Sequence, residues 1–148
     1  MIAALIAGIH YLGIMLIAAT LLVEFLTLKV ALSRPLLERL VKVDAVYGIA
    51  ALAVLVTGFL RITTAYGKGP AFYMQSGVFH AKVGLFILMG LLSVVPTLRF
   101  LRWRKAASAG QPLPLPEQIA STRRMVLIEL HILAVLPFLA AVMARGLM

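Results

Sequence analysis

Four stretches of roughly 20 mostly apolar residues dominate the sequence, at about 3–28, 45–63, 78–99 and 125–144. A helix of that length crosses the roughly 30 Å hydrocarbon core of a bilayer. Because the chain is 63% hydrophobic and only 13% charged, it has too little polar surface for a soluble domain. No strand-like alternation interrupts the pattern. The sequence therefore predicts an all-α protein, a four-helix transmembrane bundle that forms a single integral membrane domain over residues 1–148.

The basic residues gather at the ends of the predicted spans, so the net charge of +9 does not indicate a nucleic-acid partner. If both termini lie on one side of the membrane, ten of the fourteen Lys and Arg residues lie on the other side. These ten are Lys29, Arg34, Arg39, Lys42, Arg99, Arg102, Arg104, Lys105, Arg123 and Arg124. The positive-inside rule then places both connecting loops in the cytoplasm and both termini outside. Because the first span lacks a basic flank before it and is too long for a signal-peptide core, we expect it to stay in the mature protein.

A short amphipathic helix is predicted at the membrane interface between spans one and two. Ser33 is expected to cap its N-terminus, and Pro35 lies early in its first turn. The apolar residues that would dip into the headgroups are Leu36, Leu37, Leu40 and Val41. Asp44 is then expected to cap the second span, where its carboxylate meets the positive end of the helix dipole.

Two histidines, His10 and His80, are the main candidates for binding a metal-containing cofactor. Both belong to spans that run from outside to inside, and both lie roughly 5 to 12 Å below the outer boundary at about 1.5 Å per residue. Histidines on two helices at one depth are an arrangement that ligates b-type haem, whereas the absence of cysteine excludes covalently attached c-type haem. Gly13 and Gly84, one turn further on, would leave room for a flat macrocycle. The alternative is that each histidine bonds a carbonyl, a headgroup or water.

Arg61 and Lys82 are the candidate contacts for haem propionates, because both lie at the outer ends of their spans. The alternative for Arg61 is a flanking anchor, and that for Lys82 is a side chain that snorkels to the headgroups. His131 is a poorer ligand candidate because Ala134 and Val135 occupy the neighbouring positions on its face. A hydrogen bond between helices, or simple packing, is its alternative role.

A second set of polar residues lies in the inner half of the predicted bundle. Its charged members are Glu24, Asp44, Glu129, Arg123 and Arg124. The simplest interpretation is a network of charges at the helix ends. The alternative is a proton path into the bundle, with Glu129 and His131 as catalytic relay groups, since redox chemistry inside a membrane needs protons to be delivered.

The whole chain resembles an uncharacterised bacterial membrane family, domain of unknown function 2214. The residues that carry the resemblance are His10, the run Asp44-Ala-Val-Tyr-Gly, the run Thr57-Gly-Phe-Leu-Arg61 and the run Pro96-Thr-Leu-Arg-Phe-Leu-Arg-Trp103. The family name implies a bacterial membrane protein but no activity. We therefore expect the protein in the bacterial plasma membrane.

A more distant resemblance is to the HemJ-like protoporphyrinogen oxidases, which are small four-helix membrane proteins. They too have a histidine early in the first helix and a His-x-Lys at the start of the third, here His10 and His80-Ala-Lys82. The spacing from Arg123 to Glu129 at the start of the fourth helix is also similar. This resemblance implies haem b held by His10 and by a group in the third helix.

Together these patterns predict a b-haem-binding integral membrane redox protein, either a tetrapyrrole or quinone oxidoreductase or an electron carrier. The alternative is a cofactor-free structural or assembly subunit of a larger membrane complex, in which the polar residues only fix the register of the helices. The expected partner is the lipid bilayer. Glycines on spans two and three also favour a homo-oligomer, because small residues permit close contact between helices.

Overall fold

The computed structural model describes residues 1–63 and 69–146, and these residues form an all-α fold. Its helices are α1 (Ile2–Thr27), α2 (Arg34–Thr63), α3 (Pro70–Met74), α4 (Gly77–Ser108) and α5 (Pro116–Ala144). The four long helices are each long and apolar enough to cross a membrane. This confirms the predicted fold class and the four predicted spans.

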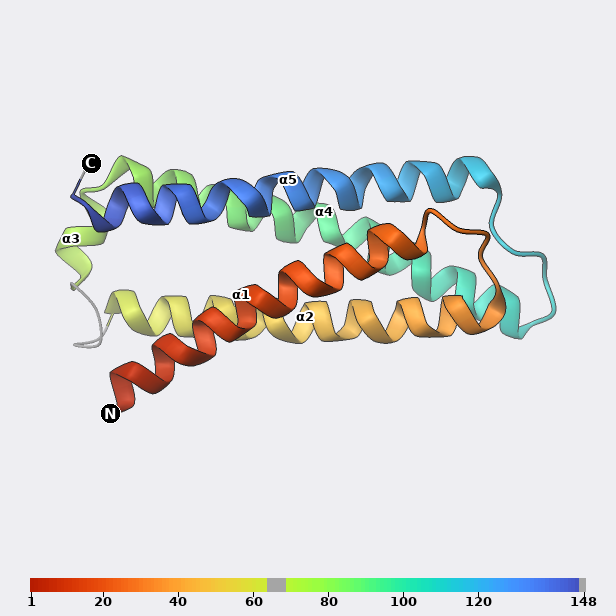
Figure 1. Cartoon of the computed structure of the whole chain (residues 1–148), viewed down its shortest axis with the longest axis horizontal. Helices are drawn as coiled ribbons and strands as arrows, with labels where there is room; N and C mark the ends of the chain where they lie inside the picture. Colours follow the sequence, from red (N-terminus) through yellow and green to blue (C-terminus); the bar gives the residue numbers. More distant parts are fainter. Residues whose placement is uncertain (64–68, 147–148) are drawn as a thin grey trace.

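The four long helices run up and down side by side (Figure 1). Both ends of the chain and the short helix α3 lie at one end of the bundle, and the connections 28–33 and 109–115 lie at the other. Helix α1 packs against α2 and α5, and α4 packs against the same two helices. Because α1 and α4 do not contact each other, they occupy opposite corners of the bundle. We call the end with the termini the terminal end, and the other the loop end.

The predicted interfacial helix is wrong as a separate element, because α2 runs unbroken from Arg34 to Thr63. Ser33 does cap it, with its Oγ accepting from the Leu36 N–H at 3.4 Å. Asp44, however, lies inside α2 and caps nothing. The buried residues of this part of α2 are spaced as one face of a continuous helix: Leu37, Leu40, Val41, Asp44 and Tyr47. With no glycine or proline between Pro35 and Asp44, nothing in the sequence stops the helix there.

The prolines inside the third and fourth spans do not end their helices. Pro96 lies inside α4 and Pro137 inside α5. Helix α4 extends nine residues beyond the predicted span, and the connection to α5, which contains Pro112 and Pro114, covers residues 109–115. Pro116 sits at the start of α5, where its missing N–H costs the helix nothing.

The tightly packed core lies towards the loop end. Its fully buried side chains include Ile17, Leu21, Leu40, Phe100 and Val126, which come from all four long helices. On α4, all buried residues lie at Met89 or after it, and none of the first 12 residues of the helix is buried. The terminal end of α4 is thus more loosely packed than the loop end. Most of the large apolar side chains that remain exposed lie on the helices, as expected where helices face lipid.

Candidate functional site

His10 lies inside the bundle with a defined hydrogen-bond partner. Its side chain is 8% exposed, and its Nδ1 lies 2.9 Å from Thr57 Oγ1 on α2. The Thr57 hydroxyl donates its single hydrogen to the Ala53 carbonyl at 2.6 Å. In the tautomer whose neutral imidazole carries its proton on Nδ1, Thr57 Oγ1 accepts from His10. Nε2 is then the ring nitrogen with a free lone pair.

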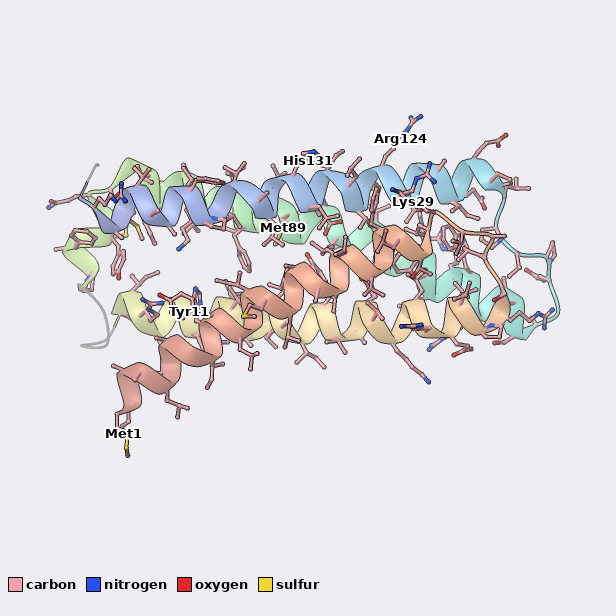
Figure 2. All side chains as sticks on the ribbon, in the orientation of Figure 1. Met1, Tyr11, Lys29, Met89, Arg124 and His131 are labelled. Atoms are coloured by element: carbon pink, nitrogen blue, oxygen red, sulfur yellow. The ribbon has the colours of Figure 1, made fainter. Side chains whose placement is uncertain are left out.

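Two predicted cofactor contacts lie near this imidazole. The positive charges of Lys82 on α4 and Arg61 on α2 both act on His10, and the charge of Arg61 also acts on Lys82. The Arg61 guanidinium carbon lies 5.7 Å from the centre of the Tyr11 ring, and Figure 2 shows Tyr11 on α1 where it runs past α2. Helices α1, α2 and α4 thus bring His10, Arg61 and Lys82 together, and we call these three residues the outer basic group.

His80 does not join the outer basic group. It is exposed, and its Nδ1 lies 2.8 Å from the Ser76 carbonyl oxygen in the first turn of its own helix. Side chains two residues apart on a helix project to nearly opposite sides. His80 is exposed whereas Lys82 is half-buried, so His80 lies on the more exposed side of α4. The expected pair of facing histidines is not brought together.

The two glycines predicted beside a macrocycle have different surroundings. A Cβ built on Gly13 would lie 2.7 Å from Val54 Cγ2 and 3.4 Å from the Ala50 carbonyl oxygen. Helix α2 thus fills the space beside Gly13, so this glycine serves the close approach of α1 and α2 and leaves no gap there. Gly84 is exposed, and a Cβ there would meet nothing within 4 Å.

A second polar group lies towards the loop end, where three helices each contribute a buried carboxylate. These are Glu24 on α1, Asp44 on α2 and Glu129 on α5, which are 2%, 7% and 1% exposed. The negative charges of Asp44 and Glu129 act on Glu24, and the charge of Asp44 acts on Glu129. We call these three residues the inner carboxylate cluster.

Two hydroxyl groups donate to the cluster, and each lies on a different helix from the carboxylate that accepts its hydrogen bond. The Tyr47 hydroxyl donates to Glu129 Oε2 at 3.2 Å, and the Thr97 hydroxyl donates to Asp44 Oδ1 at 2.8 Å. Oε1 of Glu24 and Oε1 of Glu129 are buried and have no hydrogen-bond partner among the described residues. The sequence analysis had missed Thr97, whose only signal is a hydroxyl near the end of the third predicted span.

The sequence predicted a charge network of these acids with Arg123 and Arg124, and Arg99 is a third arginine towards the loop end. Arg99 donates to Thr122 Oγ1 at 2.9 Å and to Ser121 Oγ at 3.1 Å. Arg123 donates to the Leu28 carbonyl at 3.5 Å, and Arg124 points away from the bundle (Figure 2). The predicted charge network at the helix ends is therefore not formed by ion pairs between these arginines and the three acids.

His131, the other half of the predicted proton relay, lies apart from Glu129. It is exposed, it points away from the bundle on the outer side of α5 (Figure 2), and its Nδ1 lies 2.6 Å from the Leu127 carbonyl oxygen. Within the described part of the chain, no group of three or more His, Asp or Glu residues is arranged to hold a metal ion.

The fold and its interior define a class: a four-helix membrane protein with one basic and one acidic polar group inside the bundle. The chain belongs to a family described as predicted membrane protein (DUF2214), whose model matches residues 2–148. It matches no curated protein and no solved structure. The family supports the membrane assignment, and the activity has to be inferred from the two polar groups.

Proposed function

We propose that the protein is a membrane redox protein that binds haem b through His10. The observation that carries this proposal is the hydrogen bond between His10 and Thr57. Histidines that ligate metals donate their other ring N–H to a fixed acceptor, which sets the tautomer and the orientation of the ring. The Thr57 hydroxyl does this for His10 before any metal is present, and it leaves Nε2 as the ligating atom.

The surroundings of His10 suit the rest of a haem group. Haem carries two propionate carboxylates, and Arg61 and Lys82 are the basic side chains whose charges act on His10. A guanidinium can bind a carboxylate through two parallel hydrogen bonds, and an ammonium provides a compact positive charge. A resemblance to the HemJ-like protoporphyrinogen oxidases also supports haem b at His10. In this proposal the third-helix contact comes from Lys82, and His80 is not a ligand.

Bound haem would supply one-electron redox chemistry, and a tetrapyrrole, a quinone or a partner chain would be its electron donor or acceptor. His10 would hold the group, Arg61 and Lys82 would orient it, and the surrounding bundle would limit the access of water. We place the protein in the bacterial plasma membrane with both termini outside, because the loop end carries most of the basic residues.

The visible spectrum of protein purified in detergent after expression with a haem precursor tests the proposal. We expect a Soret band that shifts on reduction, and we expect His10→Ala to abolish it. His131→Ala is the matched control, since His131 is exposed and bonds a carbonyl of its own helix. A protein without a Soret band, or a His10→Ala variant that keeps it, contradicts the proposal.

A cofactor-free assembly subunit is the second candidate. The close approach of α1 and α2 at Gly13 favours it, because the two helices pack there without anything between them. Absence of the Soret band would leave this candidate in place.

A further inference from the structure

The inner carboxylate cluster has more negative charge than the bundle neutralises. Glu24 and Glu129 are among the most deeply buried side chains in the described structure. Within the described residues, the only donors to the cluster are two neutral hydroxyls, those of Tyr47 and Thr97. A buried ionised carboxylate without a partner is so costly that such groups instead become neutral. We propose that the inner carboxylate cluster is a proton-binding site inside the membrane, in which Glu24 and Glu129 carry exchangeable protons.

The position of the free oxygens supports this proposal. Glu129 uses Oε2 to accept from Tyr47, so its buried Oε1 is available for a proton. The buried Oε1 of Glu24 is available in the same way. These two atoms come from α1 and α5, which pack against each other. Packing and helix register explain hydrogen-bonded polar pairs, but they do not explain two buried oxygens that bond no described residue.

Among the described residues around the cluster, no cation is bonded to its carboxylates. Helix α1 contributes Glu24, α2 contributes Asp44 and Tyr47, and α5 contributes Glu129. Helix α4 faces the cluster with Thr97, while its Arg99 is bonded to hydroxyls of α5. On α5, Arg123 bonds the Leu28 carbonyl. The two side chains whose charges act on Glu24, those of Asp44 and Glu129, are both acidic.

A proton suits the cluster better than a metal ion. A divalent cation needs six or more oxygen ligands converging on one point, and in the described chain these carboxylates are not grouped closely enough to hold a metal. A proton needs only one oxygen. At about 1.5 Å per residue, Glu129 lies about 6 Å inside the predicted span 125–144, counted from its loop end. The site therefore lies within the predicted span, where a protonatable carboxyl can take up or release a proton during a reaction.

Infrared difference spectroscopy of the full chain in lipid nanodiscs tests the proposal. A protonated carboxyl group gives a carbonyl stretch that an ionised one lacks, and the band shifts in D2O. We expect this band in the wild type at neutral pH, and its loss at high pH. Glu24→Gln and Glu129→Gln should each remove part of it. Glu117→Gln is the matched control, because Glu117 is an exposed glutamate on the same helix as Glu129.

A second variant tests the same site and keeps all three carboxylates. Tyr47→Phe deletes the hydroxyl that donates to Glu129, so the Glu129 component of the band should move to higher frequency. This change in frequency would not result from a loss of packing alone. If Glu129→Gln does not fold, Tyr47→Phe still decides the assignment of that component.

Three results would overturn the proposal. One is a wild-type protein without the band at neutral pH. Another is a band that neither glutamine variant nor Tyr47→Phe changes. The third is a band that sodium chloride removes and choline chloride does not, since sodium would then be the ion that the site holds. All spectra are also recorded on His10→Ala, so that the result is independent of haem and a failure of one proposal is distinguishable from a failure of the other.

Discussion

The contact between α1 and α2 at Gly13 gives a sharp test of the packing beside His10. Gly13→Ala places a Cβ 2.7 Å from Val54 Cγ2, whereas carbon atoms in favourable contact are about 3.5 to 4.0 Å apart. The Ala50 carbonyl oxygen, 3.4 Å away, blocks movement on another side. One helix must therefore shift, or Val54 must leave its rotamer. Overpacking of this kind costs about 1 to 3 kcal/mol.

The same substitution at Gly8 is the matched control, because Gly8 is on the same helix and a Cβ there meets nothing within 4 Å. Both substitutions replace glycine by a better helix former, a gain of about 1 kcal/mol that cancels in the comparison. We therefore expect Gly13→Ala to be less stable than Gly8→Ala by about 1 to 3 kcal/mol. The assay is reversible unfolding in mixed detergent micelles, followed by circular dichroism.

A second substitution shows whether the contact itself is responsible. Val54→Ala removes the Cγ2 atom that the new Cβ meets, so Gly13→Ala should cost less in the Val54→Ala background than in the wild type. Equal stability of Gly13→Ala and Gly8→Ala would refute the packing described here.

Two further predictions concern the packing of the core and the orientation of the protein in the membrane. Leu21→Ala should destabilise the bundle by about 2 to 5 kcal/mol, whereas Leu22→Ala should have a much smaller effect, because Leu21 is 1% exposed and Leu22 is 49% exposed. Equal effects in the unfolding assay would contradict the assigned face of α1. Since the chain has no cysteine, single cysteines report sidedness: Gln75→Cys should react with a membrane-impermeant maleimide in intact cells, and Gln111→Cys only after permeabilisation. The reverse pattern would invert the proposed topology.

The fold could be predicted from the sequence because the bilayer leaves few alternatives. A long apolar stretch must satisfy its backbone groups internally, so each of the four stretches forms a helix. The boundary of α2 could not be predicted in the same way. The segment before Asp44 is amphipathic and basic, which is typical of an interfacial helix. Only the packing of Leu37 and Leu40 in the core shows that it is part of α2.

The candidate site was harder to predict, because a sequence indicates how deep a side chain lies in the membrane but not which neighbouring helix it faces. The rise per residue sets the depth of His10 and His80 to within about a turn. The same helix geometry requires His80 and Lys82 to face opposite ways. It does not decide which of them faces inward, because that depends on how α4 is rotated against α2 and α5. The sequence therefore found three members of the outer basic group and also included His80, which lies outside it.

The inner carboxylate cluster bears on the choice between a functional site and a structural subunit. A subunit whose polar residues only fix helix register accounts for the bond of His10 to Thr57 and for that of Asp44 to Thr97, since both pairs are satisfied. It does not account for buried oxygens of Glu24 and Glu129 that bond no described residue. Two leucines would stabilise the same positions without any desolvation cost. The retained acids therefore favour a role in which the charge of the bundle interior changes.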